Sequence, residues 1–307
     1  MSEAYVAVFG GCNMDISGKS KAGLLLHDSN PGDVRMTPGG VGRNIAANIA
    51  LVGIEAKIVT AFGDDDKKTL ILQNAPEKLN FEWSFTFQDV GTGSYLVVLD
   101  DEGEMYVAVN DMKAVDKLGK EEMDSRRELA EKASYTVVDA NLKEEALETV
   151  FSWDTKIIVD GVSAVKVGKF KPFLSKINVL KCNVLEARAL SELGDGASIS
   201  DCGRALLAKG SEHVLITAGS DGAYLYSADQ GLHFTTSPMA IKGATGAGDA
   251  FVGMLTAELV QGKSLEEAIV GAMAASRMVL KSDHSDLSVF DRRQWEKEKE
   301  EIQYDTI

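Results

Sequence analysis

The sequence predicts an α/β fold with a mostly parallel sheet covered by helices on both faces. From residue 135 onward, short apolar runs alternate with helical periods, an order typical of parallel strands joined by crossover helices. Two glycine-rich turns, at residues 39–44 and 246–249, each lead into a helical stretch. Period-two alternation between residues 94 and 109 also predicts a small antiparallel sheet inserted into the chain.

The elements expected before residue 120 are mostly strands. They are strands over 5–9 and 54–62, a small-residue helix over 45–51, and hairpin strands over 94–99 and 105–109 joined by a turn at 100–103. A turn at 29–32 and an alternating stretch at 34–36 extend the inserted sheet. We expect this sheet, with segments of about 18–37 and 83–112, to act as a lid over a ligand.

Beyond residue 120 the expected helices and strands alternate regularly. They are helices over 121–132, from 143, over 184–193, 199–209, 246–260 and 265–280, strands over 135–139, 156–160, 177–182 and 213–217, hairpin strands over 222–226 and 232–235, and a charged terminal helix over 292–301. The chain contains no linker long enough to separate independent units. We therefore expect residues 1–307 to form one domain.

Composition excludes several classes of partner. The chain has 32 Lys and Arg against 47 Asp and Glu, a formal net charge of −15, which argues against nucleic acid or an anionic membrane as the main partner. Its three cysteines and four histidines show no metal-ligand spacing. Because no leader precedes Tyr5 and no apolar run approaches the ~20 residues of a membrane span, we expect a cytoplasmic location.

The turn Gly246-Ala247-Gly248-Asp249 has the features of an anion site. Glycines allow the backbone N–H groups to approach a ligand closely, and a helix that begins there presents unpaired donors and the positive end of its dipole. Asp249 adds a carboxylate to the first turn. Phosphoryl transfer to a hydroxyl group needs both parts, a cradle and a base. The alternative is an ordinary helix start, where Asp is favoured electrostatically.

A second polar group follows the first strand. Asn13 and Asp15 come just after Gly10-Gly11, and in open α/β sheets ligands bind beyond the carboxyl ends of the strands. The alternative is a local Asx turn. A dinucleotide fingerprint is disfavoured here because the spaced third glycine is missing.

In combination, these motifs resemble the ribokinase-like (phosphofructokinase-B) sugar kinases over almost the whole chain. The resemblance rests on Asn13 and Asp15, the turn at 39–44, the Asn-x-x-Glu motif at 183–186, the loop at 217–222 and the turn at 246–249. It implies a ribokinase-like three-layer sandwich with a mostly parallel central sheet and a small inserted β-sheet lid. It also implies a kinase that uses ATP and Mg²⁺.

The resemblance assigns roles residue by residue. Asp249 is the implied general base, and the N–H groups of Gly246, Ala247 and Gly248 are the implied phosphoryl cradle. The implied acceptor contacts are Asn13, Asp15, Gly39, Gly40 and Asn44. Asn183 and Glu186 are implied to position Mg²⁺, and the implied nucleotide contacts are Asn183, Thr217, Gly219, Gly222 and Ser276.

Other segments resemble one branch of this family, the pseudouridine kinases. They are 28–32, 37–46, 103–112 and 160–166, and they imply pseudouridine as the acceptor. Ser94, Asn110 and Lys166 are the candidate base contacts, Asn110 because an amide both donates and accepts hydrogen bonds. The chain departs from the family pattern where Gly243-Ala244 replaces Asp-Thr, which puts an activating K⁺ ion in doubt.

Structural alternatives exist for several of these residues. Asn183 and Glu186 also fit a capping box. Lys166 could be a solvated lysine at a helix start, and Ser276 could simply pack on a small-residue helix face. Tyr95 and Tyr106 are expected to be structural residues of the lid strands. The lid could also mediate a homodimer through its exposed edges.

Two other functions remain open at this level. One is a kinase of the same family acting on another nucleoside or sugar. The other is a ligand-binding regulator without catalytic activity.

Overall fold

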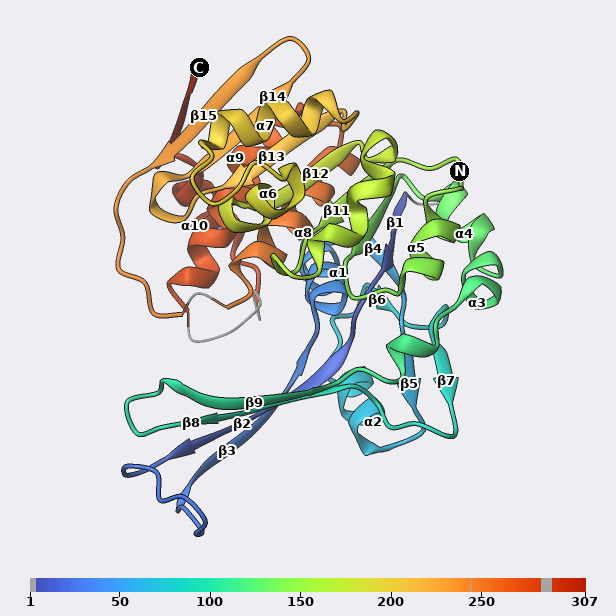
Figure 1. Cartoon of the computed structure of the whole chain (residues 1–307), viewed down its shortest axis with the longest axis vertical. Helices are drawn as coiled ribbons and strands as arrows, with labels where there is room; N and C mark the ends of the chain where they lie inside the picture. The colour runs from blue at the N-terminus through green and yellow to red at the C-terminus, as the bar shows by residue number, and fades with distance from the viewer. Residues whose placement is uncertain (1–3, 244, 283–288) are drawn as a thin grey trace.

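The computed structural model describes residues 4–243, 245–282 and 289–307. A ten-stranded sheet crosses the molecule in the order β16-β15-β14-β13-β12-β11-β10-β1-β4-β6 (Figure 1). The strands from β13 to β6 pair in parallel, whereas β14, β15 and β16 pair antiparallel at one edge. The predicted mostly parallel α/β fold is thus confirmed.

The strands of this sheet are short. They are β1 (Tyr5–Phe9), β4 (Glu55–Val59), β6 (Leu79–Asn80), β10 (Tyr135–Asp139), β11 (Ile157–Asp160), β12 (Val179–Asn183), β13 (His213–Thr217), β14 (Ala223–Ser227), β15 (Gly231–Thr236) and β16 (Ile302–Thr306). Two further strands, β5 (Ala61–Gly63) and β7 (Phe85–Phe87), form a separate parallel pair.

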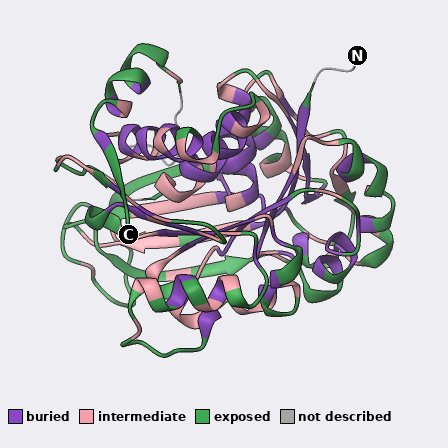
Figure 2. Cartoon of the chain, turned by 90° about the horizontal axis from the view of Figure 1, so that it is seen from above, coloured by how far each residue is buried: buried purple, intermediate pink, exposed green. Residues whose placement is uncertain are grey.

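Helices lie on both faces of the sheet. The helices of the described residues are α1 (Val41–Leu51), α2 (Asp66–Gln73), α3 (Lys120–Asp124), α4 (Arg127–Lys132), α5 (Glu144–Val150), α6 (Val184–Ser191), α7 (Ile199–Ala208), α8 (Ala247–Val260), α9 (Leu265–Leu280) and α10 (Arg292–Lys299), with 3₁₀ turns η1 (Val115–Lys117), η2 (Val167–Lys176) and η3 (Gly219–Asp221). Of these, α2 lies apart from the large sheet and packs through Ile71 against Met14 and Phe62. Buried residues continue along nearly the whole of α8, and Figure 2 shows exposed residues gathered on the outer helices and loops.

A hydrophobic core lies on each face of the large sheet, and side chains of β1 alternate between the two cores. Val6 and Val8 point to one face and pack with residues of α1, α8 and α9, whereas Ala7 and Phe9 point to the other and pack with residues of α5, α6 and α7. Strands buried on both faces read as continuous apolar runs, as β1 does. The carboxyl ends of the parallel strands therefore remain as the polar edge of the sheet.

A four-stranded sheet projects from this body (Figure 1). Its order is β3-β2-β8-β9, with β2 (Asn13–Ser20), β3 (Gly32–Gly39), β8 (Ser94–Leu99) and β9 (Met105–Asp111). β2 continues directly from the turn after β1, so the small sheet begins at the polar edge of the large one. Most of β3 and β9 is exposed.

The structure corrects several expected elements. The helix expected over 121–132 is split into α3 and α4. The break falls at Arg126, which leaves helical geometry and donates from Nε to the Trp83 carbonyl, 2.8 Å away. Helix α2 was not among the expected elements, and it begins at the end of the acidic run at 64–66. Asp65 caps that helix by accepting from the Lys68 N–H. Beyond α10 the chain forms strand β16 and does not remain helical to residue 301.

Candidate active site

The polar edge of the central sheet carries several charged and amide side chains. Asp139 ends β10, Asp160 ends β11, Asn183 ends β12 and Thr217 ends β13. Because these strands are parallel neighbours, their ends meet at one edge. Asp139 and Asp160 were not singled out from the sequence, although each ends an expected strand and the strand-end rule could have found them.

The first glycine turn packs against the end of β1. Gly40 has φ 97° and precedes α1, and a Cβ there would lie 2.6 Å from the carbonyl oxygen of Gly11. Only glycine combines that backbone angle with that contact. The Arg43 N–H donates to the same Gly11 carbonyl at 3.1 Å. The start of α1 is thereby fixed beside Asn13.

Asn13 and Asp15 form one polar group at the start of β2. The Asn13 amide nitrogen donates to the Asp15 carboxylate, 2.5 Å away. A Cβ on Gly39 would collide with that carboxylate at 2.2 Å, so the adjacent strand leaves room for it. Burial raises the pKa of Asp15, while Asn13 and the Arg43 charge oppose the shift. The arrangement offers hydrogen-bond acceptors and donors of the type that bind hydroxyl groups.

The second glycine turn begins α8. Gly246 precedes the helix with a left-handed φ of 82°, and in the described part of the chain no side chain caps this helix start. The first N–H groups of α8 therefore have no intrahelical partner. Together with the helix dipole, these unpaired donors have the geometry that an anion site requires.

The two glycine turns meet in space. The Asn44 amide donates from Nδ2 to the Asp249 carboxylate at 2.9 Å, across 205 residues of sequence. One helical turn further along, α1 and α8 touch at Gly253, where a Cβ would lie 2.6 Å from Cβ of Asn48. This close helix crossing places Asn44 beside Asp249.

Asp249 lies in an unusual electrostatic environment. Burial and the nearby Asp160 carboxylate raise the pKa of Asp249 to about 8, against the opposing effects of Asn44 and Lys181. A carboxylate with a pKa near neutrality is a better proton acceptor than an ordinary one. Perturbed carboxyl groups of this kind are enriched at functional sites.

Lys181 lies beneath the cradle and was not predicted from the sequence. Its Nζ pairs with Asp160 Oδ2 at 2.9 Å, and both side chains are buried. The same nitrogen lies 3.0 Å from where a Cβ of Gly248 would be. Burial opposes the charge of Lys181, but Asp160 and Glu186 outweigh it and raise its pKa. A lysine inside the apolar run of β12 is the signal that sequence reasoning overlooked.

Asn183 and Glu186 bond to each other. The Asn183 side chain accepts from the Glu186 N–H at 2.9 Å, and Glu186 Oε2 accepts from the Asn183 N–H at 2.9 Å. This is the capping box that the sequence left as an alternative. Among the described residues no cluster of three His, Cys, Asp or Glu side chains could hold a metal. The buried oxygen donors of Glu186 fit a Mg²⁺ ion that keeps most of its ligands as water and phosphate.

A cavity of about 430 Å³ opens beside the start of α8. Thr217, Gly219, Gly222 and Ser276 line it, as do Ala247 and Gly248, and its wall is completed by the apolar residues Met239, Ile241, Phe251, Met273 and Leu280. The Ser276 hydroxyl donates to the Ala247 carbonyl at 2.7 Å, so it braces the turn. An apolar slot with polar groups at one end suits a nucleotide.

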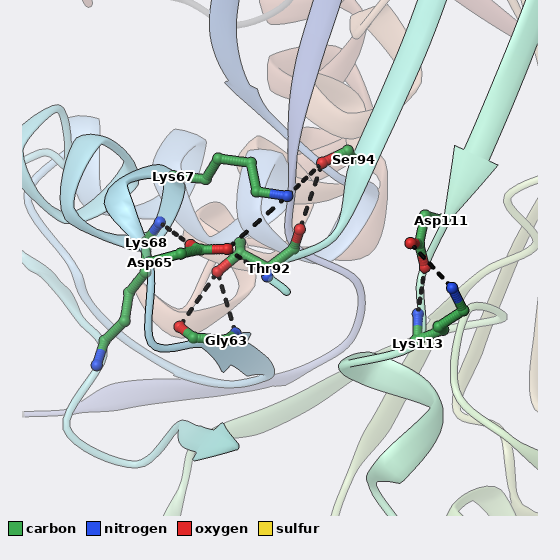
Figure 3. A network of polar contacts seen from close by, with 8 residues as sticks. All are labelled: Gly63, Asp65, Lys67, Lys68, Thr92, Ser94, Asp111 and Lys113. Atoms are coloured by element: carbon green, nitrogen blue, oxygen red, sulfur yellow. Dashed lines mark hydrogen bonds and ion pairs between the residues drawn. The ribbon is translucent and has the colours of Figure 1, made fainter. Parts of the chain in front are cut away.

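Ser94 lies on a different face from Asp15. Its hydroxyl accepts from Lys67 Nζ of α2 at 2.8 Å, and Figure 3 shows this contact together with the Asp65 and Thr92 bonds beneath it. Ser94 pairs with Met14, whose side chain is buried against α2. The structure therefore separates Ser94 from the Asn13 and Asp15 group.

The other two candidate base contacts lie elsewhere. Asn110 pairs across the strands with Tyr95, which pairs with Asp15, so the structure does bring Asn110 to the Asp15 face. Lys166 is only partly exposed, and its Nζ donates to Asn141 at 2.6 Å, at the edge formed by β10. Lys166 is therefore not the solvated helix-start lysine that was the alternative to a role in base binding.

The departure at 243–244 is only partly visible. A Cβ on Gly243 would lie 3.6 Å from the Ser282 carbonyl oxygen. Ala244 lies outside the described residues. No helix in the described ranges is long and apolar enough to span a membrane.

Comparison with known proteins agrees with this geometry. Residues 3–289 match the pfkB family of carbohydrate kinases, so the chain belongs to that family and is a sugar or nucleoside kinase of the ribokinase type by descent and fold. Among curated proteins, the pseudouridine kinase of Escherichia coli (strain K12) is 35% identical over 93% of this chain and 94% of its own length.

Other relatives widen the range of acceptors in the family. The guanosine-inosine kinase of Exiguobacterium acetylicum is 27% identical over 92% of this chain and 96% of its own length. Among solved structures, ribokinase from Thermotoga maritima superposes with a TM-score of 0.87 at 23% identity. The superposition covers 96% of this chain and 98% of the ribokinase chain. The ribokinase-like fold expected from the motifs is therefore confirmed.

Proposed function

We propose that this chain transfers the γ-phosphoryl group of ATP to the ribose 5′-hydroxyl of pseudouridine. The observation that carries the proposal is the Asn44–Asp249 hydrogen bond of 2.9 Å. It joins the first glycine turn, at the start of α1, to the helix start of α8. A nucleotide-sized cavity opens at that same start of α8. The 35% identity to a pseudouridine kinase supports the choice of acceptor.

The acceptor ribose binds at the first glycine turn in this proposal. Asn13 and Asp15 hold its hydroxyl groups, since vicinal hydroxyls need paired donors and acceptors. Gly39 and Gly40 let the sugar approach the backbone. Asn44 orients both the sugar and the carboxylate of Asp249, the proposed general base. Asn110 and Lys166 are the proposed contacts to the nucleobase. Ser94 supports the sheet from its other face.

The chemical step uses Asp249 and the α8 helix start. Asp249 takes the proton of the 5′-hydroxyl as its oxygen forms a bond to the γ-phosphorus. The bond from that phosphorus to the β–γ bridging oxygen breaks, and ADP leaves. The N–H groups of Gly246, Ala247 and Gly248 stabilise the charge on the transferring group, an effect usually worth about 3–4 kcal/mol per donor.

The remaining residues hold the nucleotide. Thr217, Gly219, Gly222 and Ser276 line its cavity, and Asn183 lies at the adjacent strand end. A bound Mg²⁺ ion neutralises phosphate charge, and Asn183 and Glu186 would hold it through water. Each of the two side chains would give up part of its bonding to the other to do so.

A panel of acceptors tests the proposal. ATP consumption is measured with pseudouridine, uridine, adenosine and ribose, each with and without K⁺. We expect pseudouridine to show the highest kcat/KM, and little effect of K⁺, because Gly243-Ala244 replaces the Asp-Thr pair. Rapid turnover of ribose or adenosine without any of pseudouridine would reject the acceptor and favour another kinase of the family.

The small sheet supports two further proposals. As a lid it would close over the acceptor, since β2 begins at Asn13. Its exposed apolar residues, among them Val34, Met36, Val107 and Val109, would pair with a second copy to form a homodimer. Light scattering of the wild type and of a Val34→Lys variant tests the dimer, and a monomeric wild type would contradict it.

A further inference from the structure

One row of side chains crosses the whole small sheet on the face that carries Asp15. In strand order it is Thr37, Asp15, Tyr95 and Asn110, each directly opposite the next. Residues paired in this way point to the same face of a sheet. From Asp15, the row therefore extends across β8 and β9, away from the group that is proposed to bind ribose.

The neighbouring row points the opposite way. Met14, Ser94 and Asp111 are directly opposite one another. Met14 is buried with Phe62 and Ile71 of the α2 side, and Ser94 bonds to Lys67 of α2 (Figure 3). The small sheet thus has one face that packs against α2. Its other face carries Asp15, which lies beside Gly39 of the first glycine turn.

Tyr95 is the aromatic member of the Asp15 row. Its hydroxyl contacts the Met105 sulfur at 3.7 Å, so the side chain extends along the sheet toward the hairpin. Tyr95 is partly exposed, whereas Thr37 and Asn110, on the strands beyond it, are exposed. An aromatic ring between a carboxylate and an amide provides a flat apolar surface with polar groups on both sides.

We propose that Tyr95 is a specificity-determining residue that packs against the planar base of a nucleoside acceptor. This rests on the proposed function, and it replaces the structural role expected for Tyr95 from the sequence. Asp15 holds the ribose at one side of the ring, and Asn110 hydrogen-bonds to the polar edge of the base at the other. A free sugar occupies only the Asp15 end and gains nothing from Tyr95.

Kinetics of matched variants with two acceptors test this inference. Tyr95→Ala is expected to lower kcat/KM for pseudouridine roughly 10- to 100-fold, the usual range for loss of base stacking. The loss should lie mainly in KM, and kcat/KM for ribose should stay within about twofold of wild type. Where ribose turnover is slow, its inhibition constant against pseudouridine gives the same comparison.

Two variants control for indirect effects. Tyr95→Phe keeps the ring and should retain wild-type nucleoside kinetics. Leu96→Ala removes an exposed apolar side chain from the opposite face and should leave both acceptors unaffected. Thermal unfolding of all three variants checks that the sheet is intact.

The outcomes separate this inference from the proposed function. Equal losses for pseudouridine and ribose, or no loss for pseudouridine, overturn the role of Tyr95 while leaving the kinase intact. A wild-type protein that phosphorylates no nucleoside overturns the proposed function, and the Tyr95 inference with it.

Discussion

The place where the two glycine turns (39–44 and 246–249) meet, here called the junction, is tightly packed and buried, whereas the small sheet is open and exposed. At the junction, backbones touch so closely that a Cβ on Gly40 or Gly253 would overlap its neighbours, and charged groups are buried together. The small sheet instead exposes most of β3 and β9 and carries its polar row on one open face. In the proposed function, the junction performs the chemistry and the small sheet selects the acceptor.

Replacing Asp249 with Asn should have the largest effect on activity. We expect kcat to fall about 10²- to 10⁴-fold, the usual contribution of a general base, with KM for the acceptor changed little. Initial rates with pseudouridine and ATP measure it. Unchanged phosphorylation would remove Asp249 from its role as base, whereas binding without turnover in the wild type would favour the inactive regulator.

The same variant should be more stable than the wild type at alkaline pH. The pKa of Asp249 is about 8 in the folded protein against 3.8 ordinarily, so the folded state holds this proton more tightly than the unfolded state. Its stabilising effect is complete below pH 3.8 and is lost as the pH rises to about 8. The Tm difference between Asp249→Asn and wild type should therefore widen in favour of the variant from pH 4 to pH 8.

Lys181→Met should disturb the junction through charge. Lys181 lowers the pKa of Asp249, so removing it should move the acid limb of the kcat/KM profile, which lies near pH 8, to higher pH. It also leaves Asp160 buried without its partner, which costs roughly 3–5 kcal/mol of unfolding free energy.

Lys67→Met is the matched control for the Lys181 variant, because Lys67 bonds to Ser94 beneath the small sheet. It should leave the acid limb in place. Equal shifts in the two lysine variants would show that the limb does not report on Asp249.

Gly40→Ala should weaken both stability and acceptor binding. Its φ of 97° and the overlap with Gly11 together should cost about 1–3 kcal/mol or more of unfolding free energy. Gly53 has a similar φ of 91°, but nothing lies within 4 Å of a Cβ there. Gly53→Ala should therefore cost less and leave KM unchanged, as denaturant unfolding and kinetics can measure.

Ser94→Ala should have the smallest effect of the series. Because Ser94 faces α2, its loss removes one hydrogen bond to Lys67 and should change KM for the acceptor less than about twofold, for a stability cost of roughly 1 kcal/mol. A tenfold rise in KM would return Ser94 to the acceptor site and would count against the two-faced description of the sheet.

Local patterns accounted for much of the fold. Apolar runs and helical periods predicted β10, β13 and α9 at the residues where they occur. The two strands are buried on both faces and the helix buries a regular apolar stripe, so each leaves a local pattern in the sequence. Elements that depend on a distant partner were missed. β16 is a strand because Ile302–Thr306 pairs with β15. The helix breaks at Arg126, whose side chain bonds to the distant Trp83 carbonyl and lies 4.3 Å from the Phe85 ring.

By itself, the sequence determined the family, the two glycine turns and the carboxylate in the second of them. Glycine and helix-start chemistry act over a few residues, so their signals are local. Tertiary structure alone decided that Asn44 bonds to Asp249, that Lys181 lies beneath Gly248, and that Tyr95 and not Ser94 shares a face with Asp15. Each of these depends on strand register or helix crossing, and both are set by packing between segments far apart in the chain.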